Sequence, residues 1–310
     1  IFVLILGGTG ALGKSLIKRY YNENKIIIFS RDEHKHVDLM KKYDKLLSHL
    51  GDIRDKDSLR NCFDKYKPNV VINTAALKHV PICETNSIES VKTNILGHQN
   101  VIETVKEFKD IETLIFVSTD KACKPINIYG MCKAISEKLY SNYAETNTKV
   151  VMVRYGNVLE STGSVIPYFK SILESGNVKL PITHLDMTRF LLTLDDAVEL
   201  INWTYNHRKS HGKIAVPKIK SMKIVDLARC LIKSYGLKGK VGLEIVGVRP
   251  GEKLHEEMIS QEEWFRTEDD TNYLINNTQI HNEMWSYNSK DTLLSLDESY
   301  KFLQKSGVIK

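Results

Sequence analysis

A tyrosine and a lysine four residues apart are the first residues in this chain whose types and spacing indicate chemistry. On a helix, Tyr129 and Lys133 would lie on the same face. A tyrosine that acts as a base must lower its pKa from about 10 towards about 7, which corresponds to about 4 kcal/mol. An ammonium ~4 Å away supplies a gross Coulomb energy of about that size at an effective dielectric near 20. The pair therefore predicts proton abstraction by Tyr129 assisted by Lys133, although the same spacing also arises by chance on solvated helices.

An acid and an amine precede that pair. Thr119, Asp120 and Lys121 directly follow a β-branched strand pattern. An adjacent carboxylate would raise the pKa of Lys121, whereas a lysine that acts as a base must be neutral. A protonated Asp120 removes this conflict and gives the site a proton donor. The competing interpretation is a local ion pair between Asp120 and Lys121 on a loop.

A glycine-rich turn follows the first strand pattern and opens a helix. Its spacing, GxxGxxG, permits a tight turn, close approach of the backbone to a pyrophosphate, and close packing of helix on strand. A diphosphate there would meet free N–H groups and the positive end of the helix. The turn predicts dinucleotide binding. The expected contacts are Gly7, Gly8, Thr9, Gly10, Ala11, Leu12 and Gly13.

The second strand pattern ends with Ser30 and Arg31 instead of an acidic residue. An acid there would bind the ribose 2′-hydroxyl of NAD, whereas arginine suits the 2′-phosphate of NADP. We therefore expect NADP, with a solvated Arg31 as the alternative. Further expected cofactor contacts, each also consistent with ordinary packing, are Asp52 and Ile53 after the third strand and Ala75 and Ala76 after the fourth.

Strand and helix patterns alternate through the first half of the chain. The motifs lie in loops directly after these strands, so the sheet that the strands form would position them. Repeated strand–helix–strand units imply a parallel sheet with helices on both faces. We expect an α/β fold: a Rossmann-type, doubly wound parallel sheet with a smaller C-terminal α/β lobe. The expected strands are Ile1–Leu6, Lys25–Phe29, Val70–Asn73, Thr113–Ser118 and Val150–Val153. The expected helices are Leu12–Tyr21, Ser58–Tyr66, Ser87–Phe108 and Ile128–Ala144.

The regular alternation of strand and helix patterns ends after Asn157, where the expected loops are longer and contain prolines. We expect residues 1–157 to form the dinucleotide-binding domain, with residues 184–216 returning to it. Residues 158–310 are expected to form an interleaved lobe that binds the substrate.

Composition excludes several other classes of protein. The 310 residues contain no apolar run of the ~20 residues that cross a bilayer, and the net charge of +6 shows no basic stripe interleaved with aromatics. Five cysteines without a CxxC pair argue against a disulfide framework and a zinc site. We expect a cytoplasmic protein without metal, nucleic-acid or membrane partners. Because the chain opens inside an apolar stretch, we also expect residues before Ile1, and a targeting segment there stays an open alternative.

The longer motifs resemble the extended short-chain dehydrogenase/reductase superfamily and, within it, the UDP-N-acetylglucosamine 4,6-dehydratases that invert carbon 5. The position that discriminates is Lys121, because retaining dehydratases carry Thr-Asp-Glu at this point and epimerases usually carry small or hydroxyl residues. The resemblance runs from Gly7 to about Glu256. It is carried by Gly7–Gly13, Ala75–Pro81, Ser118–Ala122, Pro125–Gly130, Lys133, Arg154–Val158, Met187–Phe190 and Arg249–Glu256.

The resemblance implies a reaction on a UDP-sugar. Tyr129, with Lys133, would take the proton of the sugar 4-hydroxyl while hydride passes from carbon 4 to NADP. Lys121 would take the carbon-5 proton and Asp120 would protonate the departing 6-hydroxyl, with Thr119 beside them. Hydride would return to carbon 6 while a proton, for which Tyr129 is one candidate donor, inverts carbon 5. The product would be a UDP-2-acetamido-2,6-dideoxy-L-arabino-hexos-4-ulose.

The resemblance also implies binding residues and a homo-oligomer. Arg189 is equally consistent with a structural salt bridge, and the family often has arginine where Thr162 stands, which puts substrate affinity in doubt. A UDP-sugar 4-epimerase and a non-catalytic NADP-sensing protein are the alternatives. Further cofactor contacts would be Lys78, Asn94, Tyr129, Lys133 and Val158. Substrate contacts would be Lys78, Asn157, Thr162, Gly163, Ser164, Val165, Ile166, Thr183, Arg189, Arg249 and Glu252.

Overall fold

The computed structural model describes residues 1–144, 147–161 and 163–310. Their main feature is a nine-stranded sheet in the order β14-β15-β10-β6-β5-β4-β1-β2-β3. Its first six strands along the chain pair in parallel. They are β1 (Phe2–Leu6), β2 (Lys25–Ser30), β3 (Leu47–Leu50), β4 (Val70–Asn73), β5 (Thr113–Val117) and β6 (Lys149–Val153).

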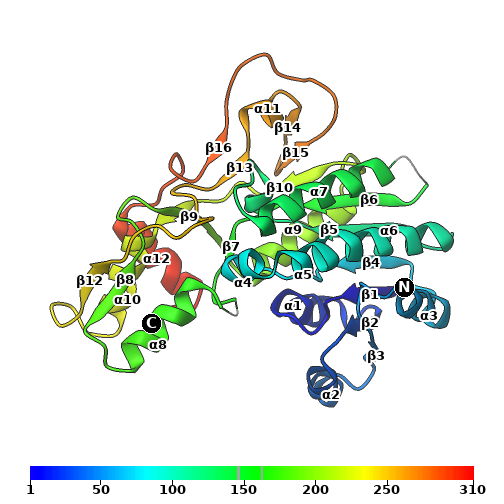
Figure 1. The fold of residues 1–310 in the computed structure, drawn as a ribbon, viewed down its shortest axis with the longest axis horizontal. Helices are drawn as coiled ribbons and strands as arrows, with labels where there is room; N and C mark the ends of the chain where they lie inside the picture. The colour runs from blue at the N-terminus through cyan, green and yellow to red at the C-terminus, as the bar shows by residue number, and fades with distance from the viewer. Residues whose placement is uncertain (145–146, 162) are drawn as a thin grey trace.

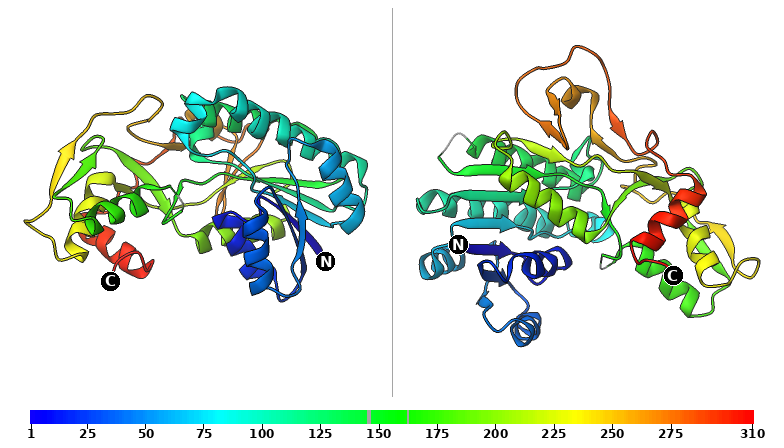
Figure 2. Two further views of the ribbon diagram at one scale, coloured as in Figure 1. Left: turned by 60° about the horizontal axis from the view of Figure 1, so that its bottom comes forward. Right: turned by 180° about the vertical axis from the view of Figure 1, so that it is seen from behind.

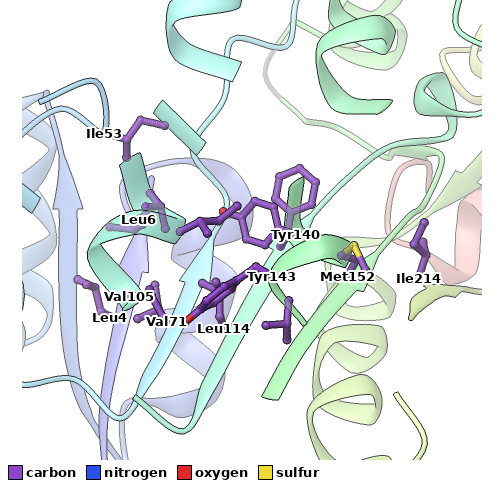
Figure 3. Packing of buried hydrophobic residues seen from close by; sticks show 14 of the residues in the cluster. Leu4, Leu6, Ile53, Val71, Val105, Leu114, Tyr140, Tyr143, Met152 and Ile214 are labelled. Atoms are coloured by element: carbon purple, nitrogen blue, oxygen red, sulfur yellow. The ribbon is translucent and has the colours of Figure 1, made fainter. Parts of the chain in front are cut away.

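The central strands β1 and β5 are buried along almost their whole length, because helices cover both faces of the sheet. Leu4 and Leu6 of β1 belong to one buried cluster, and Val3 and Ile5 belong to a second cluster on the opposite face. Figure 3 shows the first of these clusters, in which Tyr140 packs with side chains of the sheet.

Helices from distant parts of the sequence cover the two faces (Figures 1 and 2). Helix α6 contacts both α3 and α7, and α1 contacts α9. This arrangement confirms the predicted α/β, Rossmann-type fold. The helices of this part are α1 (Ala11–Tyr20), α2 (Glu33–Lys42), α3 (Lys56–Tyr66), α4 (Val80–Thr85), α5 (Ser87–Val91), α6 (Gly97–Glu107), α7 (Ile128–Tyr143) and α9 (Leu194–Asn206), with a π-helical turn η1 (Lys92–Leu96) and a 3-10 turn η2 (Asp120–Ala122).

Later segments return to extend the sheet. Strand β10 (Ile214–Val216) pairs in parallel with β6 and antiparallel with β15 (Tyr273–Ile275), and β14 (Thr267–Asp269) completes the edge. The sequence analysis did not foresee this antiparallel edge, because its three strands are only three residues long and carry little periodic signal.

A second lobe with its own buried core lies beside the sheet (Figures 1 and 2). Its strands form a three-stranded sheet, β11-β9-β7, and a parallel pair, β12-β8; β13 and β16 pair separately. No helix in the described ranges has the length and hydrophobicity needed to cross a bilayer. The elements of the lobe are β7 (Asn157–Val158), α8 (Val165–Glu174), β8 (Lys179–Ile182), β9 (Thr188–Leu192), β11 (Ser221–Lys223), α10 (Ile224–Ser234), β12 (Gly242–Ile245) and α12 (Leu296–Lys305). Three further elements pack against the core of the large sheet instead: β13 (Glu257–Ile259), α11 (Gln261–Trp264) and β16 (Tyr287–Asn288).

Candidate active site

The predicted catalytic residues lie where β5 ends and α7 begins. The backbone N–H of Asp120 donates to the carbonyl of Tyr155, which fixes the turn η2 against the end of β6. A Cβ atom on Gly130 would lie 2.2 Å from the carbonyl oxygen of Lys121, so the first turn of α7 packs directly on η2. Asn127 begins α7 because its side chain accepts from the Gly130 N–H. These contacts hold the two halves of the motif in one place.

Asp120, Lys121 and Tyr129 converge in the structure. The Nζ atom of Lys121 lies 3.0 Å from Oδ1 of Asp120, which is fully buried and also accepts a hydrogen bond of 2.9 Å from the Thr119 hydroxyl. Tyr129 is buried, and it lies close enough to Lys121 and Asp120 for both of their charges to act on its phenol. An acid, an amine and a phenol therefore share one small region at the carboxyl end of β5.

The electrostatics of the phenol differ from the expectation built on Lys133. Burial raises the pKa of Tyr129 to about 12, and the nearby positive charge that opposes this rise is Lys121. Lys133 instead donates to the Val117 carbonyl at 2.7 Å and lies over the Phe116 ring, and burial lowers its pKa to about 7. The contribution of Lys133 to proton abstraction stays a prediction.

The structure shows the problem expected for Lys121: nearby carboxylates favour its charged form, whereas a base must be neutral. Burial acts to lower the pKa of this lysine, but the carboxylates of Asp120 and Glu256 outweigh it and raise the pKa to about 12. Lys121 is therefore an ammonium in this state. It must release a proton before it can act as a base.

The glycine turn fits a dinucleotide. Gly7 has φ = 78°, and an added Cβ there would lie within 2.9 Å of the Ala75 backbone. A Cβ on Gly13 would lie 2.4 Å from the Gly8 carbonyl oxygen, so α1 packs closely on the turn. Gly10 caps α1 without a side-chain hydrogen bond, which leaves the first N–H groups of the helix available for a diphosphate.

The end of β2 lies next to this turn. The hydroxyls of Thr9 and Ser30 are 2.9 Å apart, and Ser30 is hydrogen-bonded to buried His36 at 2.7 Å. Arg31 is more than half exposed and lies 3.7 Å from the Asp52 carboxylate. A pocket of about 410 Å³ opens beside Asp52, whereas Ile53 is buried in the core. Ser30, Arg31 and Asp52 thus lie together, as an adenosine site requires.

Side chains of η1 and α6 hold the loop after β4 in place. Asn94, on η1, accepts from the Leu77 N–H at 2.9 Å and donates to the Leu77 carbonyl at 2.8 Å. A ring nitrogen of buried His98 lies 3.0 Å from the Ala75 carbonyl oxygen, and burial lowers the pKa of this histidine to about 3. Asn94 therefore orders the loop that carries Ala75 and Ala76, and its predicted contact with the cofactor stays a prediction. Lys78 follows in the same loop with an exposed side chain.

A pocket of about 600 Å³ in the second lobe gathers many of the predicted substrate contacts. Ile166 lies apart from it in the core of the lobe, and Thr162 falls outside the described residues. Within the described residues, buried oxygens of Asn157, Ser164 and Glu252 have no hydrogen-bond partner, so they are available to a ligand. The predicted residues that line the pocket are Gly163, Ser164, Val165, Thr183 and Arg249.

The two predicted arginine contacts, Arg249 and Arg189, lie in different surroundings. Arg249 pairs with Glu252 at 2.8 Å at the pocket. Arg189 is buried on β9, donates to the Thr188 and Leu254 carbonyls, and lies 3.9 Å from Glu256. These contacts match the structural alternative for Arg189, and its predicted contact with the substrate stays a prediction.

The sequence analysis missed several buried charged residues around the site. Glu256 faces Lys121 at 3.7 Å, although its motif was noted for its other residues. Arg154 is 1% exposed and joins Glu137 of α7 to Glu263 of α11. The sequence offered only one sign of these residues, namely charged residues inside the motifs. Their burial could not be predicted, because it depends on how segments far apart in the sequence pack together.

This fold and arrangement of side chains define the class as a Rossmann-type enzyme of the extended short-chain dehydrogenase/reductase superfamily. The model of a family described as polysaccharide biosynthesis protein matches residues 3–278, and the chain belongs to this family. The resemblance drawn from the motifs is confirmed by a named relative. The chain is similar to UDP-N-acetylglucosamine 4,6-dehydratase (inverting) of Campylobacter jejuni, with 43% identity over 87% of this chain and 81% of that protein.

Two further comparisons bear on the fold and on the rival activity. The chain is 36% identical to UDP-glucose 4-epimerase of Rickettsia canadensis over 86% of this chain and 80% of that protein. The solved structure of Pen from Bacillus thuringiensis matches with a TM-score of 0.90 and 31% identity, covering 99% of this chain and 98% of that one.

Proposed function

We propose that the chain is an NADP-dependent UDP-N-acetylglucosamine 4,6-dehydratase that inverts carbon 5. One observation carries this proposal: the Asp120–Lys121 pair lies beside Tyr129 at the carboxyl end of β5. Elimination of water needs a base for carbon 5 and an acid for the 6-hydroxyl, whereas epimerisation at carbon 4 needs neither. The named dehydratase relative supports the same substrate.

The cofactor site is the glycine turn between β1 and α1. A bound nicotinamide dinucleotide would supply the hydride acceptor for carbon 4 and the hydride donor for carbon 6. The turn and the first N–H groups of α1 would hold the diphosphate. Ser30 and Arg31 favour NADP, because a hydroxyl and a guanidinium suit the 2′-phosphate better than the 2′-hydroxyl.

The oxidation step requires a phenolate. Tyr129 takes the proton of the 4-hydroxyl as carbon 4 becomes a ketone. Because burial raises the pKa of its phenol, positive charge must oppose that effect, and the Lys121 ammonium supplies some of it in this structure. Lys121 becomes the neutral amine of the next step only when its proton passes to Oδ1 of Asp120, 3.0 Å away. The ketone then acidifies the proton on carbon 5.

The elimination step uses the pair on η2. Neutral Lys121 takes the carbon-5 proton, and protonated Asp120 gives its proton to the 6-hydroxyl, which leaves as water. Lys121 ends as an ammonium and Asp120 as a carboxylate. Their side chains are 3.0 Å apart, so the proton can pass back from Nζ to Oδ1 and restore the reactive state. A proton delivered to the opposite face of carbon 5, with Tyr129 as candidate donor, completes the inversion.

The second lobe would hold the UDP group. Its pocket presents the Arg249 guanidinium, which can bind phosphate through two parallel hydrogen bonds. The unpartnered oxygens of Asn157, Ser164 and Glu252 suit the hydroxyl and amide donors of a nucleotide sugar.

Incubation with UDP-N-acetylglucosamine in deuterated water tests the proposed function. NMR should show a 4-keto-6-deoxy product that carries deuterium at carbon 5 with inverted configuration, without consumption of NADPH. A product with retained configuration, or a 4-epimer that keeps its 6-hydroxyl, would contradict the proposal.

A UDP-glucose 4-epimerase is the second candidate, because the Rickettsia relative carries that name. Such an enzyme would use Tyr129 and Lys133 but would release no water. Supplying UDP-glucose separates the two activities: an epimerase yields UDP-galactose, whereas the proposed dehydratase should form no UDP-galactose.

A homo-oligomer in the cytoplasm is part of the proposal. Helices α4, α5 and α7 contact one another and expose apolar side chains, including Ile88, which is 70% exposed. A second copy could bury this patch. Light scattering should give a mass of at least two chains, and Ile88→Glu should lower it. The five buried cysteines are unpaired, which suits a reducing compartment. The patch residues are Ile82, Ile88, Met131 and Ile135.

A further inference from the structure

A buried carboxylate next to the catalytic turn has no part in the steps above. Glu256 is 2% exposed and lies just before β13. Its Oε1 atom is 3.7 Å from Nζ of Lys121 and 3.9 Å from Nε of Arg189, and its Oε2 atom is 3.9 Å from Nζ of Lys253. Among the described residues Oε2 has no hydrogen-bond partner. Charge attraction without a hydrogen bond therefore connects Glu256 to the lysine.

The backbone holds this carboxylate in place. The N–H of Glu256 donates to the Ser289 hydroxyl at 2.9 Å, and its carbonyl accepts from the Ser289 N–H at 2.8 Å. The Ser289 hydroxyl is also hydrogen-bonded to Thr188. A buried ionised group is costly unless it is compensated, so its retention among three cations indicates a specific electrostatic role.

Glu256 can act when Lys121 and Asp120 return to their starting protonation states. Each turnover leaves Lys121 protonated and Asp120 ionised, and the proton must return across the 3.0 Å between them. A second negative charge near Nζ stabilises the ammonium and opposes this transfer. The positive charge of Arg189 acts in the opposite direction.

We propose that Glu256 is a positioning residue that holds the Lys121 ammonium between two carboxylates and controls how readily it passes its proton to Asp120. The effect on catalysis rests on the proposed function, in which Lys121 is the base. The charged and titratable groups around Lys121 and Glu256 are Asp120 on η2, Tyr129 on α7, Arg189 on β9, and Lys253, which lies near Glu256 on the segment before β13.

The sign of the effect is fixed by charge. Removing a negative neighbour lowers the pKa of Lys121, so its neutral form becomes populated at lower pH. An opposite charge within ~4–6 Å typically moves a pKa by about 1–3 units. Glu256→Gln keeps the shape and removes the charge.

Acetylation of Lys121 by acetic anhydride measures its neutral fraction directly, without reference to turnover. Mass spectrometry of the peptide that contains residue 121 should show a rate about tenfold or more higher in E256Q than in the wild type between pH 7 and 10. E257Q is the matched control: it removes the neighbouring carboxylate, which pairs with Lys124. Equal rates in E256Q and the wild type would overturn the proposal.

A second variant covers the case in which E256Q does not fold. Glu256→Asp keeps the charge but moves it away from Nζ, so Lys121 should react faster than in the wild type and slower than in E256Q. No increase over the wild type would again overturn the proposal.

The pH profile of deuterium incorporation at carbon 5 links this control to catalysis. Its ascending limb should move to lower pH in E256Q and stay in place in E257Q. If E256Q is acetylated faster but the ascending limb of its pH profile does not move, Lys121 is not the base. The effect of Glu256 on the pKa of Lys121 would still hold in that case. Unchanged acetylation would remove the inference and leave the proposed function standing.

Discussion

The catalytic turn and the substrate pocket are built in different ways. Asp120 is fully buried, and Lys121 and Tyr129 are held by η2 and α7, which pack so closely that Gly130 admits no side chain. Arg249, by contrast, has a side chain that is 63% exposed in a long loop of the second lobe. The proposed catalytic residues are thus held by closely packed elements at the end of the sheet, whereas the proposed diphosphate contact Arg249 lies on an exposed loop.

The largest expected effect comes from removing the base. Lys121→Ala should lower dehydration by about 10²–10⁴-fold, the usual contribution of a general base, and should abolish exchange at carbon 5. Lys124→Ala is the control, because Lys124 lies three residues away with an exposed side chain. NADP affinity should stay within about twofold. Turnover near the wild-type rate would remove Lys121 from the mechanism.

The rigidity of the catalytic turn can be tested at Gly130. An added methyl group would meet the Lys121 carbonyl at 2.2 Å, so Gly130→Ala should destabilise the fold by about 1–3 kcal/mol and also lower kcat. Gly242→Ala is the control, because the nearest atom to its Cβ would be 3.9 Å away. Thermal unfolding measures the difference. Equal melting temperatures for the two variants would mean that the turn tolerates displacement.

The binding role of the pocket can be tested at Arg249. Loss of a hydrogen-bonded charge costs about 1.5–3 kcal/mol, so Arg249→Ala should raise KM for the UDP-sugar by about 10–150-fold while kcat changes little. NADP binding measured by fluorescence should not change. A fall in kcat with constant KM would mean that Arg249 acts in the chemical step, so the two regions would not have separate roles.

The smallest expected effect concerns cofactor choice. Arg31 is exposed and its contact with Asp52 is long, so Arg31→Ala should weaken NADP binding by about tenfold and leave NAD binding nearly unchanged. Calorimetric titration of both cofactors measures this. A preference for NAD that does not respond to the change would overturn the assignment of NADP.

The parts of the molecule that follow local rules could be predicted from sequence. Strand β4 was expected at the residues where it lies, and α7 was expected to extend one residue further. Residues 119, 120, 121 and 129 were expected to lie together, and they do, because a strand end and the next helix along the chain meet at one edge of a parallel sheet.

The remaining parts depend on long-range contacts that leave little local signal. The position of Glu256 follows from hydrogen bonds to Ser289, 33 residues away. The pair Arg154 and Glu263 joins segments 109 residues apart. Lys133 was expected beside the phenol from its helical spacing, which gave no sign that its ammonium donates to the Val117 carbonyl.

One short segment spans both regions of the molecule. Arg249 lies at the pocket and Glu256 lies at the catalytic lysine, so seven residue steps, at most about 24 Å of chain, connect the two ends. The segment is anchored midway, where Lys253 donates to the Cys123 carbonyl. Under the proposed function, this fixed length limits how far the hexose ring can lie from Asp120 and Lys121 once Arg249 binds the diphosphate.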